Sequence, residues 1–117
     1  MAIALRMVGE SLTQSRRIDE ARARLEEGCR IMMAVVARDP TNGWAVDGLA
    51  SLLRLHGEAL RLSSDAAVRA RACAAFKEAR QHYVALESRD ALPPASAEDY
   101  KAAQSRVAAC ETNRADR

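Results

Sequence analysis

The residues of this chain that could carry chemistry are two histidines and three cysteines. Imidazole titrates near neutrality and can act as an acid or a base, but neither histidine has a paired partner in sequence. Nucleophile elbows, Gly-rich phosphate loops and His-Glu-x-x-His zinc motifs do not occur. We therefore expect a protein that is not an enzyme and that uses no cofactor and no metal. The five residues are His56, His82, Cys29, Cys73 and Cys110.

The cysteines predict neither a disulfide framework nor a zinc site. Their number is odd, their spacing is wide, and they form no Cys-x-x-Cys pair. Each falls on or beside an apolar helical stripe, where free cysteine commonly serves as a small buried hydrophobe. Residues 1–10 do not resemble a signal peptide, and no apolar stretch approaches the ~18 residues that span a bilayer. We expect a reducing cytoplasmic location and no membrane association.

Composition favours one small domain of closely packed helices. Of the 117 residues, 49% are hydrophobic but only 3% are aromatic, so aliphatic side chains must form the interior. The net charge of +2 comes from 18 basic and 16 acidic side chains. These are mixed along the chain, as on an ordinary solvated surface, and they argue against a nucleic-acid footprint.

Apolar periodicity predicts five helices. Pro40 and the Asn42-Gly43 turn end the second, Asp65 caps the fourth, and Ser96 opens a capping box for the fifth after Pro93 and Pro94. Gly57 is expected to break or thin the third helix. The predicted ranges are about 2–14, 16–38, 42 to the turn at 63–65, 65–87 and 96–112.

Two apolar series recur about forty residues apart, which predicts stacked helical hairpins. The first contains Leu5, Val8, Gly9, Leu12, Ile18, Ala21 and Leu25, and the second contains Val46, Leu49, Ala50, Leu53, Gly57, Ala72 and Phe76. The expected fold is therefore all-α, a single helical-repeat domain over residues 1–117. Its parts are a first hairpin at 1–41, a second at 42–88 and a capping helix at 96–112.

The same residues, with Asp39-Pro40-Thr41-Asn42 between the two series, resemble the tetratricopeptide repeat family. The first unit is similar to the longer variety of about 42 residues, seen in kinesin light chains and many bacterial helical-repeat proteins. Some ten additional residues separate Gly57 from Ala72, where the second unit departs from the pattern. The C-terminal part also resembles repeat segments attached to some bacterial serine/threonine kinases, although no kinase motif is present.

The resemblance implies a concave groove, lined by the first helix of each hairpin, that holds a peptide or another protein. Glu10 and Asp47 would repel a C-terminal carboxylate, which argues against chaperone tails. Trp44 is either the anchor for a partner or a helix-start side chain packed on the previous hairpin. The predicted partner-binding residues are Arg6, Glu10, Gln14, Trp44, Asp47, Ser51 and Arg54.

Residues 31–37 are apolar all round the predicted helix, so one neighbouring hairpin cannot cover them. They are buried beneath the last two helices or they contribute to a homodimer, which we predict because two repeats fall below the ~3 usually needed for stability. The alternative function is a structural bundle dimer, or a nucleic-acid-associated regulator, without a peptide groove. Acidic residues interleave with the arginines at 16–30, which favours intrahelical ion pairs over phosphate contacts.

Overall fold

The computed structural model describes residues 17–115, with side chains for 17–112, and this part of the chain is helical without any strand. The all-α prediction is confirmed. The predicted helix at 2–14, and with it Arg6, Glu10 and Gln14, lies outside the described residues. The helices are α2 (Ile18–Arg38), α3 (Gly43–Arg61), α4 (Ala66–Arg69), α5 (Ala72–Ser88) and α6 (Ala97–Ala115), and a 3-10 turn at Pro94–Ser96 precedes α6.

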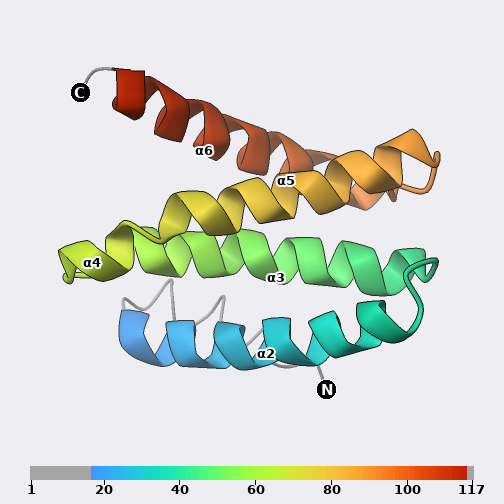
Figure 1. The fold of residues 1–117 in the computed structure, drawn as a ribbon, viewed down its shortest axis with the longest axis horizontal. Helices are drawn as coiled ribbons and strands as arrows, with labels where there is room; N and C mark the ends of the chain where they lie inside the picture. Colours follow the sequence, from blue (N-terminus) through green and yellow to red (C-terminus); the bar gives the residue numbers. More distant parts are fainter. Residues whose placement is uncertain (1–16, 116–117) are drawn as a thin grey trace.

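The long helices lie side by side in the order in which the chain forms them. Figure 1 shows α2, α3, α5 and α6 as successive rods, with each connection reversing the direction of the chain. The most extensive contacts join α3 to α5, α2 to α3, and α5 to α6. Spatial order therefore follows chain order, as expected for stacked hairpins, and α3 is the central helix with neighbours on both sides.

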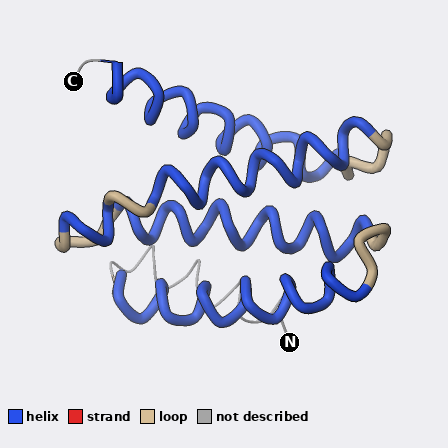
Figure 2. The backbone as a smooth tube through the Cα atoms, in the orientation of Figure 1, coloured by secondary structure: helices blue, strands red, loops and turns tan. Residues whose placement is uncertain are grey.

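Local sequence signals explain where the helices begin. The Asn42 side chain accepts a hydrogen bond from the backbone N–H of Ala45 at 3.1 Å, which caps α3. Asp65 caps α4 in the same way, accepting from Ala67 N–H at 2.9 Å. Both caps lie in short connections (Figure 2). The turn at 63–65 and its capping aspartate are confirmed.

Two helix predictions need correction. The single helix expected at 65–87 is divided into α4 and α5, because a tight turn with a bond from Arg71 N–H to Val68 C=O (3.0 Å) lies between them. The Arg69 guanidinium also donates to the Ser63 carbonyl at 2.9 Å, which holds α4 against the end of α3. Conversely, α3 continues through Gly57 without a break.

The core follows α3 along its length. Apolar side chains of α2 and α5 close over it from either side, and Tyr83 of α5 stacks on Tyr100 of α6 with ring centroids 5.5 Å apart. A smaller cluster around Phe76 and Val107 joins α5 to α6. The segment at 31–37 is only partly covered: Met32 is buried, whereas Met33 is 41% exposed.

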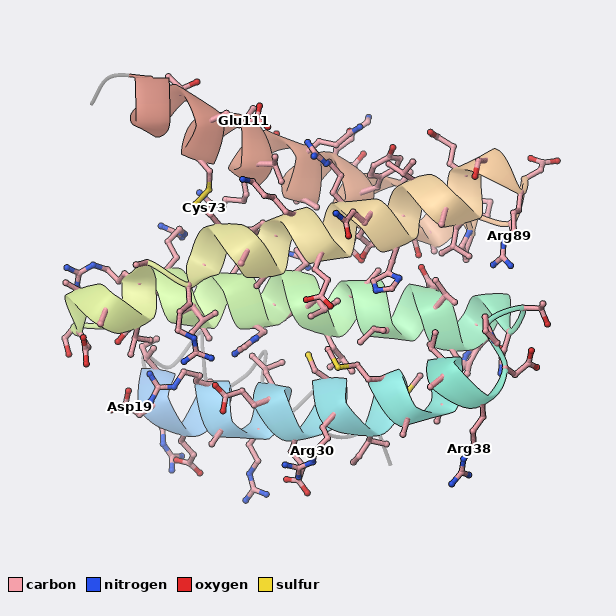
Figure 3. All side chains as sticks on the ribbon, in the orientation of Figure 1. Asp19, Arg30, Arg38, Cys73, Arg89 and Glu111 are labelled. Carbon is pink, nitrogen blue, oxygen red and sulfur yellow. A yellow bond between two sulfur atoms is a disulfide. The ribbon has the colours of Figure 1, made fainter. Side chains whose placement is uncertain are left out.

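The cysteine prediction is wrong for two of the three residues. Cys73 of α5 and Cys110 of α6 form a disulfide, with their Cα atoms 6.0 Å apart. Figure 3 shows this yellow bond between the two helices, beside the label of Cys73. Cys29 is free and buried, as predicted.

In the described range 17–115, no helix combines the length and apolar character needed to cross a membrane.

Candidate binding groove

A groove with a cavity volume of about 360 Å³ opens between α2, α3 and α5. Each helix contributes residues spaced three or four positions apart, and this spacing places them on one helical face. The groove is therefore built by three elements, with α3 as its floor. The lining residues are Glu26, Cys29, Arg30, Met33, Leu53, His56, Leu60, Arg71, Ala74, Ala75 and Glu78.

The floor is apolar and the sides carry charges. Leu53 and Leu60 of α3 are buried beneath the groove, and Met33 of α2 borders it with a partly exposed side chain. On α5, Ala74 and Ala75 present only methyl groups, which leaves room for a bound side chain. Apolar surface beneath polar edges is the usual arrangement of a binding site.

A polar bridge links the three helices within the groove. The His56 Nε2 atom lies 3.3 Å from Glu26 Oε1, and the Arg71 guanidinium lies 3.6 Å from the same carboxylate oxygen. Burial lowers the pKa of His56, and the Glu26 hydrogen bond and charge offset this only in part. His56 is therefore neutral at neutral pH, and it acts as a hydrogen-bonding group of the groove.

The Cys29 thiol in the groove lies in an environment that disfavours the nucleophilic thiolate form. Burial, together with the smaller effect of the negative charges of Glu78 and Glu26, raises the pKa of Cys29 to about 12. A nucleophilic cysteine needs the opposite shift, because the thiolate is the reactive form. Among residues 17–112 no group of three or more His, Cys, Asp or Glu side chains could hold a metal ion.

Two rim charges have no ion-pair partner within the described side chains. Arg30 stands on the α2 side and Glu78 on the α5 side, and neither belongs to any of the salt bridges of residues 17–112. Charges of opposite sign on opposite rims can fix the direction of a bound segment.

The predicted site residues of α3 lie on the opposite face of this helix. With 3.6 residues per turn, positions 44, 47, 51 and 54 fall about half a turn away from 53, 56 and 60. Trp44 is 62% exposed and is therefore not packed away, whereas Ser51 is buried. None of Trp44, Asp47, Ser51 and Arg54 lines the groove. Their role in binding a partner stays a prediction.

The C-terminal helix covers much of that opposite face. Ser96, the last residue of the 3-10 turn before α6, donates from its hydroxyl to Asp47 Oδ1 at 2.7 Å. Arg54 pairs with Asp99 at 3.0 Å. Arg106 donates to the two carboxylate oxygens of Glu58 at 2.6 and 3.2 Å. These three contacts form what we call the polar seam between α3 and α6.

The groove itself was not predicted from the sequence. Glu26 and His56 are 30 residues apart and belong to different helices, so no motif spacing brings them together. The available signal was a second stripe on α3, formed by Leu53, His56 and Leu60 at steps of three and four.

No protein-family model matches this chain, and no curated protein or solved structure is significantly similar to it. The functional argument therefore depends on the groove and the polar seam, and the tetratricopeptide resemblance stays a prediction.

Proposed function

We propose that this protein is a noncatalytic interaction module, an adaptor that binds a helical or extended segment of a protein partner in the α2–α3–α5 groove. The observation that supports this most directly is the cavity of about 360 Å³ with an apolar floor and charged rims. The raised pKa of the Cys29 thiol supports a noncatalytic role.

The groove geometry suggests the character of the partner. Met33, Leu53 and Ala75 would contact an apolar side chain, since burial of such a side chain contributes roughly 1.5–3 kcal/mol. Arg30 and Glu78 would pair with an acidic and a basic residue on either side of it. A short amphipathic segment with an apolar residue flanked by opposite charges fits these requirements.

Selection from a displayed-peptide library tests the proposal. The bait is the whole chain, and the decoy is Ala74→Arg, which fills the groove from an exposed position of α5. Ala109→Arg is the matched control, because Ala109 is an exposed alanine of α6 outside the groove. Peptides should be retained by the chain and by Ala109→Arg but lost from Ala74→Arg.

Amide chemical-shift mapping then locates the bound peptide. We expect the shifts to centre on Met33, Leu53 and Ala75. Enrichment that is equal on the decoy, or shifts confined to α6, would contradict the groove as the binding site.

A homodimer is the second candidate assembly, and α2 supports it. Among the described helices α2 has one extensive neighbour, α3, and its exposed Met33 adjoins the exposed Ala34 and Ala37. An apolar edge of this kind is a surface that a second copy could cover. The nucleic-acid alternative has less support, because Arg17 pairs with Glu20 and Arg22 lies 3.9 Å from Asp19.

We also propose, on the sequence grounds given above, membership of the long tetratricopeptide variety and a cytoplasmic location. In that compartment the disulfide between Cys73 and Cys110 would be exposed to cellular thiols, which keep most cytosolic cysteines reduced.

A further inference from the structure

The helix α6 is attached to the rest of the molecule by few apolar contacts. Among its described side chains, those of residues 97–112, the buried apolar ones are Tyr100, Ala103 and Val107, and only Tyr100 is large. The remaining noncovalent attachment is polar. It consists of the polar seam and a hydrogen bond from the Tyr100 hydroxyl to Glu87 Oε1 at 3.3 Å, and all of these groups can be solvated by water when the helices separate. Attachment of this kind is weaker than that of α2 or α5, because it depends less on burial of apolar surface.

The seam is also incompletely satisfied. Arg54 has a side chain only 16% exposed, and its Nε–H lacks a hydrogen-bond acceptor among the described residues. A buried donor without an acceptor destabilises the folded state, and water would satisfy this donor when the helices separate. The unsatisfied Arg54 donor therefore makes the docking of α6 less favourable.

A single covalent bond compensates for this weak attachment. The Cys73–Cys110 disulfide joins the beginning of α5 to the distal half of α6 and closes a loop with a sequence separation of 37. Both cysteines are only half-buried, so a small reductant can reach them. The opposite end of α6 is tied to α5 by the short connection through Pro93 and Pro94.

We propose that α6 is a redox-released latch over the α3–α5 face. With the disulfide intact, α6 occupies this face, and when a dithiol reductant breaks the bond, α6 is released and the face becomes an interaction surface. The partner it fits is a helix that carries an acidic residue for Arg54 and a basic residue for Glu58. The chain's own α6 meets this requirement with Asp99 and Arg106, which are seven residues apart on one helical face.

The redox step is a balanced thiol–disulfide exchange. One thiolate of the dithiol attacks a sulfur of the pair, the S–S bond breaks, and the other cysteine leaves as a thiol after protonation. The second thiol of the reductant resolves the mixed disulfide. Two electrons and two protons thus reach Cys73 and Cys110, and the reductant becomes a disulfide.

This inference does not depend on the proposed groove. The groove residues Leu53, His56 and Leu60 and the seam residues Asp47, Arg54 and Glu58 lie on opposite faces of α3. If no peptide binds in the groove, the latch proposal is unaffected. If α6 is not released on reduction, the groove proposal is unaffected.

Amide hydrogen exchange of the full chain, with and without a dithiol, tests the latch. In the reduced chain we expect exchange of the α6 amides to accelerate at least about tenfold more than exchange of the α2 and α3 amides, which reports only the loss of global stability. Cys110→Ser should show the fast pattern whether or not the dithiol is added. Unchanged exchange in α6, or equal acceleration in all helices, would overturn the proposal.

A peptide with the sequence of residues 94–112 and serine at position 110 tests the exposed face. The acceptor is the full chain with Cys110→Ser, Asp99→Lys and Arg106→Glu, in which repulsion from Arg54 and Glu58 keeps its own α6 away. Hydrogen exchange first verifies that α2 and α3 stay protected. The peptide should bind this variant, and a peptide with both charges reversed should bind at least about tenfold more weakly. Equal binding of the two peptides, or none, would reject the interaction surface.

Discussion

Gly57 of α3 faces the ring of Phe76 of α5 so closely that a Cβ atom at Gly57 would lie 2.8 Å from Phe76 Cε1. Real Cβ atoms essentially never approach a neighbour to this distance. The ring is buried in the cluster that joins α5 to α6, so it has little space to move. Glycine at this position therefore sets how closely the two central helices approach.

Gly57→Ala should lower the free energy of unfolding by about 1–3 kcal/mol, because overpacking outweighs the ~1 kcal/mol by which alanine favours a helix. Gly48→Ala is the matched control on the same helix. Its Cβ would meet only the terminal methyl of Met32 at 3.3 Å, and a flexible side chain can yield. In urea unfolding, the midpoint of Gly57→Ala should lie below that of the parent chain, and the midpoint of Gly48→Ala should lie above it. Equal midpoints for the two variants would refute the packing argument.

Asp99→Ala should lower the free energy of unfolding by about 1–3 kcal/mol, because it leaves the mostly buried Arg54 guanidinium without its carboxylate. The neighbouring Glu98→Ala should change stability by less than about 0.5 kcal/mol, since its partner Lys101 is highly exposed. Thermal or urea unfolding of both variants provides the comparison. A similar loss from each would mean that the polar seam contributes no more than a surface ion pair.

Reduction of the disulfide should destabilise the chain by up to about 4 kcal/mol, the loop-closure entropy expected for a sequence separation of 37. Urea unfolding with and without a dithiol measures this difference. The Cys110→Ser variant should give the reduced value under both conditions. A dithiol effect that persists in this variant would have to arise elsewhere.

Stability should fall as the pH drops below about 6.5. Burial lowers the pKa of both His56 and His82 in the folded state, so the unfolded chain takes up protons first. The free energy of unfolding therefore decreases between the ordinary histidine pKa and the lower folded values. His56→Gln and His82→Gln should each reduce the slope of unfolding free energy against pH in this range. An unchanged slope in the double variant would exclude the histidines as its cause.

A further loss of stability is expected in stronger acid, where Glu58 becomes protonated. Burial alone would raise the pKa of Glu58, but hydrogen bonds and charges from Arg106 and Arg61 outweigh it and hold this pKa below its ordinary value. The stabilisation is present above the unfolded pKa and disappears as the pH falls through the folded one. Glu58→Gln should remove this acidic component of the profile while leaving the histidine component.

Met33→Glu should convert a homodimer to a monomer, because it places a charge on the exposed apolar edge of α2. Val84→Glu is the control, since Val84 of α5 is exposed to nearly the same extent, 44% against 41%. Light scattering at tens of micromolar gives the mass of each. A parent that already has the mass of one chain would defeat the homodimer prediction.

The sequence predicted the helices well where the signals were local. Asp65 caps α4 as predicted. Asn42 lies in the predicted turn and also caps α3, which was not predicted. The α2 helix ends at Arg38, close to Pro40. These features depend on residues within a few positions of each other. The division of the predicted helix at 70–71 was missed, because the tight turn there contains no helix-breaking residue.

Features that depend on how helices cross were not predictable in this way. Cys73 and Cys110 become neighbours only after α5 and α6 reverse direction and pack. Which face of α3 stays open for binding likewise depends on which face α6 covers. Periodicity shows that Asp47 and Arg54 share a face, but it does not show that Ser96 and Asp99 approach that face.

The agreement between spatial order and chain order has a consequence for biosynthesis. The α2, α3 and α5 helices meet neighbours that are close in sequence, whereas the polar seam pairs residues 45, 48 and 49 positions apart. Contacts of short sequence separation form fastest, and an N-terminal part can fold during synthesis. A nascent chain can therefore complete the groove while residues 97–115 are still within the ribosome, and α6 then docks after the other described helices.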